Sequence, residues 1–325
     1  MKKRVLLTAP RFYTYPEDLY KALLDLGYDA ELVVYPKRYI AMPIFPGSPY
    51  HFIRKLYSLI KSDFSDYGKY CKKRTEGRGF DYLLSINIPV SKEYVQELRT
   101  KNPELKTIMY LWDSINRFDV RNYISMYDRV FTFDYSDSKK YGFNYSINFW
   151  SVAHGIIVKD NIDYFFVGKF SFDRADYLTK LIKNNPNSSF FIKLLVTKKS
   201  LYKKWVKTRD AYDFELMKKF ITYDAIPLYE STKYLMEAKC IIDIESYCQN
   251  GLSQRNILAL SKGKKLLTTN KLLISNYEGN SQVRDARKEY ADLSVWVNEK
   301  VNNPELANLM NQSEVHNWIN NIFRE

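Results

Sequence analysis

The chain has 325 residues, 46% of them hydrophobic and 27% charged, a composition typical of a globular protein long enough for two domains. Its net charge of +13 favours polyanionic partners such as nucleic acid, anionic lipid headgroups or phosphorylated substrates, unless it only reflects a solvated basic surface. Three cysteines without CxxC spacing and three histidines argue against a disulfide framework or a zinc site. No apolar run is long enough for a signal peptide or a membrane span, so we expect a cytoplasmic protein with peripheral membrane contact at most.

Short apolar runs alternate with amphipathic segments along the first half, the pattern of βα units around a parallel sheet. The expected strands are 4–10, 30–36, 80–89, 106–113, 127–134 and 144–150, and the expected helices are 16–27, 92–102 and 136–142. Residues 36–78 are less regular, with a proline-rich part and a basic helical stretch at 51–62. This insertion either shapes a substrate-facing surface or is an ordinary surface loop.

The periodicity lapses around residues 150–162, so we place a domain boundary there, with domains 1–155 and 156–325. The second half repeats the pattern with strands 162–170, 188–196, 240–245 and 264–270, and with helices 173–184, 230–239 and 253–262. Two helical pieces end the chain, and the last can pack back on the first domain. The expected fold class is α/β.

The stretch from CIIDIE into SYCQNGLSQRNILALSKG has the features of an anion-binding helix start. Gly251 permits a tight turn, Ser253 is a good N-cap and Arg255 falls in the first helical turn. Free backbone N–H groups and the helix dipole attract phosphate there, and an arginine adds a bidentate donor. The alternative is an ordinary capped helix with an exposed arginine.

A second site of this kind lies where the strand DYFFVGKF runs into Gly168 and Lys169 before a helix. Glycine lets the backbone approach a ligand, and the lysine can reach a phosphate as a point charge. Neither GxGxxG nor GxxxxGK[ST] occurs, so the dinucleotide fingerprint and the P-loop are absent.

The succession of elements over 162–270 resembles the nucleotide-sugar-binding C-terminal domain of GT-B glycosyltransferases. The segments YLWDSINR (110–117), YDRVFTFDYSDSKKYG (127–142) and DIESYCQNGLSQR (243–255) look like those of bacterial glycosyltransferases of capsule and lipopolysaccharide assembly. This resemblance covers the chain outside 36–78. It implies two Rossmann-like domains facing a cleft, with a nucleotide-sugar donor as substrate and no other cofactor.

The chain departs from the family at the donor site. The two acids of the retaining pattern fall on Asn250, which can still hydrogen-bond a sugar, and on Leu258, which cannot accept a bond from ribose. Glu245 is a possible substitute, although pairing of Asp243 and Glu245 with lysines is an alternative. The two acids also form a DxE, the metal-binding pattern of GT-A enzymes, but their late position beside a basic turn favours a metal-independent site.

On the acceptor side, Asp113 follows an apolar strand, where a carboxylate can take the proton of an acceptor hydroxyl. Trp112 can pack on a sugar ring. The alternatives are a helix-cap role for Asp113 or Ser114 and a core role for Trp112. His154, near the expected domain junction, is a second candidate base or else a hinge or packing histidine.

Together these features predict a glycosyltransferase that moves a sugar from a nucleotide-sugar to a capsular or lipopolysaccharide acceptor, lipid-linked or an oligosaccharide. It would work without metal or nucleic acid, as a peripheral protein on the anionic inner face of the cell membrane. The loss of acids at Asn250 and Leu258 keeps open a non-catalytic binder of the same fold. A nucleic-acid-binding protein is a weaker alternative, because no fold signature for it occurs.

Overall fold

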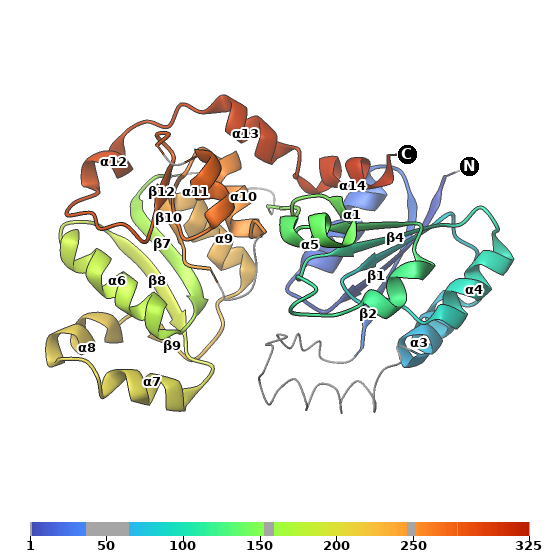
Figure 1. Cartoon of the computed structure of the whole chain (residues 1–325), viewed down its shortest axis with the longest axis horizontal. Coiled ribbons are helices and arrows are strands. Elements are labelled where there is room, and N and C mark those ends of the chain that lie inside the picture. The colour runs from blue at the N-terminus through green and yellow to red at the C-terminus, as the bar shows by residue number, and fades with distance from the viewer. Residues whose placement is uncertain (1, 37–64, 153–158, 246–250, 278, 325) are drawn as a thin grey trace. The chain divides into compact units, whose positions relative to one another are not determined.

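The computed structural model describes residues 2–36, 65–152, 159–245, 251–277 and 279–324, and it divides into two compact units. Unit 1 consists of residues 1–151, 246–252 and 313–325, and unit 2 of residues 152–245 and 253–312. Each unit contains a parallel six-stranded sheet covered by helices (Figure 1). The prediction of an α/β fold with two Rossmann-like domains is therefore confirmed. The expected boundary at 155/156 and the expected helix 51–62 lie outside the described residues.

The sheet of unit 1 has the strand order β2-β1-β3-β4-β5-β6. Its strands are β1 (Arg4–Pro10), β2 (Asp29–Tyr35), β3 (Tyr82–Ile86), β4 (Lys106–Leu111), β5 (Arg129–Thr132) and β6 (Asn144–Tyr145). Its helices are α1 (Tyr15–Asp25), α3 (Ser65–Thr75), α4 (Lys92–Lys101), η1 (Arg121–Met126), α5 (Tyr135–Tyr141) and α14 (Val315–Phe323). Alternate residues of β1 enter different cores, Val5 and Leu7 the one with α1 and α14, and Leu6 the one with α3 and α4.

The C-terminal helix α14 belongs to unit 1, although the preceding helix belongs to unit 2. Its apolar face places Trp318, Ile319 and Ile322 in the core shared with α1. The Trp318 indole donates to the carbonyl of Ile147 at 3.1 Å, which satisfies its buried N–H group. The chain thus returns to its first unit after completing the second.

The sheet of unit 2 has the strand order β12-β11-β10-β7-β8-β9. Its strands are β7 (Ile162–Lys169), β8 (Phe190–Leu195), β9 (Ile221–Thr222), β10 (Ala238–Asp243), β11 (Lys265–Thr268) and β12 (Val283–Asp285). Its helices are α6 (Phe172–Asn184), α7 (Lys199–Val206), α8 (Ala211–Lys218), α9 (Leu228–Glu237), α10 (Gln254–Ser261), α11 (Lys271–Tyr277), α12 (Ser294–Asn298) and α13 (Pro304–Asn311).

Two of the expected strands were wrong in detail. The strand expected at 144–150 is only the two residues of β6. The strand expected at 240–245 ends at Asp243, where its last pairing with β11 is made. Beyond it the Glu245 amide donates to the Thr269 hydroxyl instead of a neighbouring strand, so Glu245 lies in a loop.

Candidate functional site

Each sheet has one point where the strand order reverses. In unit 1, β2 lies on one side of β1, and the next strand along the chain, β3, lies on the other side. In unit 2, β8 and β9 lie on one side of β7, and the next strand, β10, lies on the other side. Open parallel sheets bind ligands at such a switch point, outside the carboxyl ends of the strands. The residues that follow β1 and β3 in unit 1, and β7 and β10 in unit 2, are therefore the first places to examine.

Two arginines lie at the switch point of unit 2. Arg174, in the first turn of α6, donates to the carbonyl of Ile244 at 2.7 and 3.1 Å and to that of Lys169 at 3.0 Å. It therefore connects the chain just after β10 with the end of β7. Arg255, in the first turn of α10, donates to the Val167 carbonyl of β7 at 2.5 Å. Arg255 is therefore hydrogen-bonded to strand β7, whereas the alternative interpretation expected a merely exposed arginine.

The two guanidinium groups are neighbours. Both lie over the ring of Phe166, at 5.7 Å for Arg174 and 5.8 Å for Arg255. The pKa of Arg174 is lowered, first by burial and then by the charge of Arg255. Arginine stays protonated near neutral pH, so this lowering reports a guanidinium that is both buried and close to a second positive charge, and an anion bound there would be stabilised by both groups.

One carboxylate accompanies the arginines but is largely occupied. Asp243 is buried, and its Oδ2 accepts from the side-chain amide of Asn256 at 2.9 Å and from the Thr268 hydroxyl at 3.3 Å. Its Oδ1 lies 3.9 Å from Nη1 of Arg255. Among the residues that the structure describes, the acid pairs with no lysine, and it balances only part of the charge of the two guanidinium groups.

Gly168 and Lys169 occupy the last two positions of β7. A Cβ atom at Gly168 would lie 3.0 Å from the Phe166 ring and 3.4 Å from Nη1 of Arg174, so the glycine leaves room for these side chains. The Lys169 side chain is exposed and forms no ion pair with any described residue. It is therefore free to add a third positive charge beside the arginines.

The start of α10 has the predicted cap. The Ser253 hydroxyl accepts from the backbone N–H of Asn256 at 3.2 Å. Leu258, further along the helix, is buried. Glu245 is half-buried, and its Oε1 accepts from the side-chain amide of Asn270. Glu245 thus lies beside the end of β11, where the side-chain amide of Asn270 holds it.

Gly251 has a packing role that the sequence did not indicate. A Cβ atom there would lie 2.3 Å from the ring and 2.5 Å from the carbonyl oxygen of Phe133, so only glycine fits. Gly251 and Leu252 belong to unit 1, where the Leu252 carbonyl accepts from the Asn148 side chain at 3.0 Å. Asn250 and His154 lie outside the described residues.

Beside the switch point of unit 1, Asp113 is held by Asn87 and Arg117. Its Oδ2 accepts from the Asn87 amide at 3.1 Å, its backbone N–H donates back to that side chain, and Arg117 lies 3.3 Å from its Oδ1. The carboxylate is buried, with 8% of the residue exposed. Asn87 follows β3 and Asp113 follows β4, so two neighbouring strands fix the position of one carboxylate. No described helix has Asp113 or Ser114 as its N-cap; the Ser114 hydroxyl accepts from the Asn116 backbone N–H at 3.2 Å in a local turn and also bonds to Asp137.

Aromatic side chains lie at the same edge of unit 1. Phe12 and Tyr13, directly after β1, are 47% and 55% exposed, and the Phe12 ring lies 5.7 Å from that of Trp112. Trp112 also packs against the core, as one interpretation expected, and its packing on a sugar ring stays a prediction. Three non-glycine residues have positive φ in the described part of the chain, and two of them, Tyr13 at 50° and Asn87 at 58°, flank this switch point. Such strain concentrates at ligand-binding sites.

Asp137 supports the loop that carries Asp113. Its Oδ2 accepts from the Ile115 amide at 2.7 Å, and it is buried in the first turn of α5. Burial raises its pKa, and the nearby charge of Asp134 acts in the same direction. The buried bond fixes the backbone two residues after Asp113 and makes Asp137 a positioning residue.

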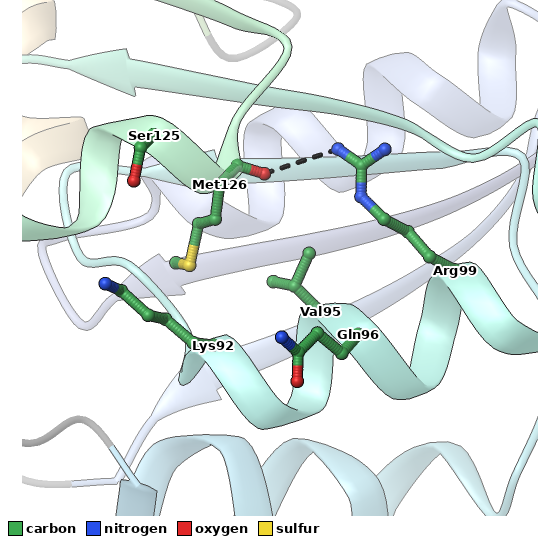
Figure 2. Close-up of a pocket in the computed structure, with 6 residues that line it drawn as sticks. All are labelled: Lys92, Val95, Gln96, Arg99, Ser125 and Met126. Carbon is green, nitrogen blue, oxygen red and sulfur yellow. Dashed lines mark hydrogen bonds between the residues drawn. The ribbon is translucent and has the colours of Figure 1, made fainter.

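A pocket on α4 and η1 does not lie at either switch point. It has a volume of about 310 Å³ and is lined by Lys92, Val95, Gln96, Arg99, Ser125 and Met126. Figure 2 shows these side chains and the bond from Arg99 to the Met126 carbonyl, 3.4 Å long. Arg99 also pairs with Asp128, which precedes β5 and so lies near the amino ends of the strands. We assign this pocket no catalytic role.

Two negative observations concern the described residues alone. They contain no group of three or more His, Cys, Asp or Glu side chains placed to hold a metal ion. No helix among them has the length and apolar composition needed to cross a bilayer.

The fold resembles those of solved glycosyltransferases. The lipopolysaccharide outer core galactosyltransferase WaaB is 11% identical over 98% of both chains, with a TM-score of 0.55. AviGT4, a glycosyltransferase involved in avilamycin A biosynthesis, is 9% identical over 98% of this chain and 95% of its own, with a TM-score of 0.58. No family model and no curated protein sequence matches the chain. The predicted GT-B fold is confirmed by these likenesses.

The sequence interpretation missed several of these residues. Arg174 has the same setting as Arg255, a cationic residue in a first helical turn after a strand and a serine cap, where acidic residues are the favoured choice. That pattern, repeated at SFDR and SQR, would have identified it. Phe12, Tyr13 and Asn87 carry no such signal, because their positive φ angles and their neighbours are tertiary features.

Proposed function

We propose that this chain, which has the GT-B fold, is a glycosyltransferase that uses a nucleotide-sugar donor. Unit 2 binds the donor and unit 1 the acceptor. The acceptor is a saccharide of a capsule or lipopolysaccharide, lipid-linked or free, and the protein works as a peripheral protein on the inner face of the cell membrane. The observation that carries the proposal is the pair of neighbouring guanidinium groups at the switch point of unit 2.

The donor side is built to hold a diphosphate. Arg174 and Arg255 are fixed by backbone carbonyls, so their remaining N–H groups are oriented before a ligand arrives. Lys169 adds a mobile charge, and the capped start of α10 at Ser253 adds the positive end of a helix dipole. When the sugar leaves, negative charge develops on the nucleotide phosphate, and these groups stabilise it. We propose that this charge replaces a divalent metal.

The acceptor side supplies a base and a platform. Asp113, held by Asn87 and Arg117, takes the proton from the acceptor hydroxyl as that oxygen attacks the anomeric carbon of the donor. The exposed rings of Phe12 and Tyr13 offer apolar faces on which a sugar ring stacks. Glu245, fixed by Asn270, is the residue of unit 2 that we propose for a donor hydroxyl.

A thermal-shift screen against UDP, GDP, CMP and inorganic phosphate tests the donor site. A ligand present at a hundred times its Kd stabilises the folded state by about 2.7 kcal/mol, which is readily measured. We expect one nucleoside diphosphate to raise the Tm well above the effect of phosphate, and the addition of EDTA not to reduce that rise. If no nucleotide raises the Tm, the proposal is wrong.

A second candidate function is a non-catalytic binder of nucleotide-sugars. The buried Leu258 favours it, since this position cannot supply the acid of the retaining pattern. The two candidates separate on incubation with the responding nucleotide-sugar. Slow hydrolysis or transfer of the sugar supports the enzyme, and a thermal shift without either supports the binder.

A further inference from the structure

The helix α7 of unit 2 carries a dense group of lysines that no carboxylate balances. Five lysines fall within ten residues: Lys198, Lys199, Lys203, Lys204 and Lys207. All five are exposed, and none of them forms an ion pair with any residue that the structure describes. From β8 to the end of β9, residues 190–222 hold nine basic and three acidic residues. A tenth of the chain thus contributes +6 of its net +13.

The fold of α7 does not need these charges. The helix is held by its opposite face, where Trp205 is fully buried and its indole donates to Asp176 at 2.8 Å, with Tyr202 and Val206 packed beside it. The spacing of Lys199 from Lys203 places like charges four residues apart, which destabilises a helix. A dense positive surface with no counter-charge among the described residues favours an external polyanion as its partner.

Exposed apolar groups accompany the lysines. Leu201 on α7 is 36% exposed, and Tyr223, directly after β9, is 54% exposed and lies 5.7 Å from the ammonium of Lys199. Tyrosine prefers the level of lipid headgroups, where its ring and its hydroxyl meet different media. Lysine is a flexible point charge and α7 contains no arginine, so the surface lacks the bidentate donors that favour nucleic acid.

We propose that α7, with its five lysines, Leu201 and Tyr223, is the surface by which the protein docks on an anionic lipid membrane. This deepens the proposed function in one respect. The α7 segment begins where β8 ends, and Leu195 at that end is paired in register with Lys169 of β7. Docking through α7 therefore holds the donor-side edge of unit 2 near the lipid surface, where a lipid-linked acceptor is found.

Vesicle sedimentation of the full chain, without any donor, tests the proposal. The vesicles are phosphatidylcholine alone or with about one-third phosphatidylglycerol, and binding is measured at low and high salt. We expect binding only to the anionic vesicles and its loss in high salt. The triple variant K203Q/K204Q/K207Q should weaken binding roughly 100-fold, since each basic residue near such a surface contributes about fivefold.

A charge-matched control separates this surface from net charge. The variant K21Q/K271Q/K300Q removes three exposed lysines that form no ion pair among the described residues, and it should change vesicle affinity less than about threefold. Equal weakening by both variants would overturn the proposal, as would binding to neutral vesicles or tight binding to a single-stranded oligonucleotide alone. Nucleotide thermal shifts of the same variants are read separately, so failure of the donor site and failure of the docking surface are distinguishable.

Discussion

The two switch points occupy the same place in the same kind of sheet but have opposite chemistry. In unit 2 two arginines lie near one buried, hydrogen-bonded carboxylate, and a lysine ends the strand beside them. In unit 1 a carboxylate fixed by an asparagine lies beside aromatic rings. The comparison indicates that the α/β edge supplies only a location, and that the side chains after each strand decide whether an anion is held or a proton is removed.

The largest expected effect comes from the carboxylate of unit 1. The substitution Asp113→Asn keeps the hydrogen-bonding shape but removes the base, so the rate of sugar transfer should fall by about 10²- to 10⁴-fold. Nucleotide-induced thermal shifts, which report unit 2, should not change. The matched variant Asp119→Asn, which removes a charge paired with Arg121, should keep full activity. Equal losses in both variants would remove Asp113 from the reaction.

The arginines of unit 2 should affect donor affinity instead. In Arg174→Gln or Arg255→Gln a charged hydrogen-bond donor to phosphate is lost, which weakens nucleotide binding by roughly 10- to 100-fold. Titration calorimetry measures this directly. Lys180→Gln, on the outer face of the same α6 helix, is the control and should bind normally. Unchanged nucleotide affinity in both arginine variants would contradict the donor site.

Gly251 sharpens the comparison because it contributes to packing in unit 1. A Cβ atom there overlaps Phe133, so Gly251→Ala should destabilise the fold by about 1–3 kcal/mol, measured by urea unfolding. In Gly79→Ala the new methyl group meets nothing within 4 Å, so this control should unfold close to the unaltered chain. Normal stability together with weaker nucleotide binding in Gly251→Ala would instead indicate that Gly251 is part of the phosphate-binding site.

The smallest expected effect concerns His316 of α14, which pairs with Asp25 of α1. His316 lies 3.0 Å from Glu314 and 3.3 Å from Asp25, and its pKa is raised, first by the bond to Glu314. Its stabilising contribution is therefore complete below the unfolded pKa near 6.5 and is lost as the pH rises through the higher folded value. The side chain is partly exposed, so we expect about 0.5 kcal/mol or less. In His316→Gln the free energy of unfolding, measured with urea between pH 6 and 8, should lose this pH dependence. If the dependence persists, the pairing of His316 does not cause it.

Much of the fold was predictable because its signals are local. Apolar runs with a period of two and of 3.6 residues predicted most strands and helices, and the serine cap of α10 was found at Ser253. The end of β10 was misplaced because strand pairing and not composition decides where a ladder stops. The same limit explains Glu245, whose amide partner comes from residue 270.

The sequence by itself determined that two parallel-sheet units exist, that Lys169 ends a strand and that Asp113 and Arg255 follow strands, because periodicity and capping depend on neighbours along the chain. Only the tertiary structure decided which of these residues meet others. Arg174 approaches Arg255 because β7 and β10 pair side by side, although the two arginines are 81 positions apart in the chain. Asn87 reaches Asp113 because β3 and β4 are neighbours, and Gly251 is glycine because Phe133 occupies the space of a side chain. Such proximities follow from strand order, which no local pattern of residues encodes.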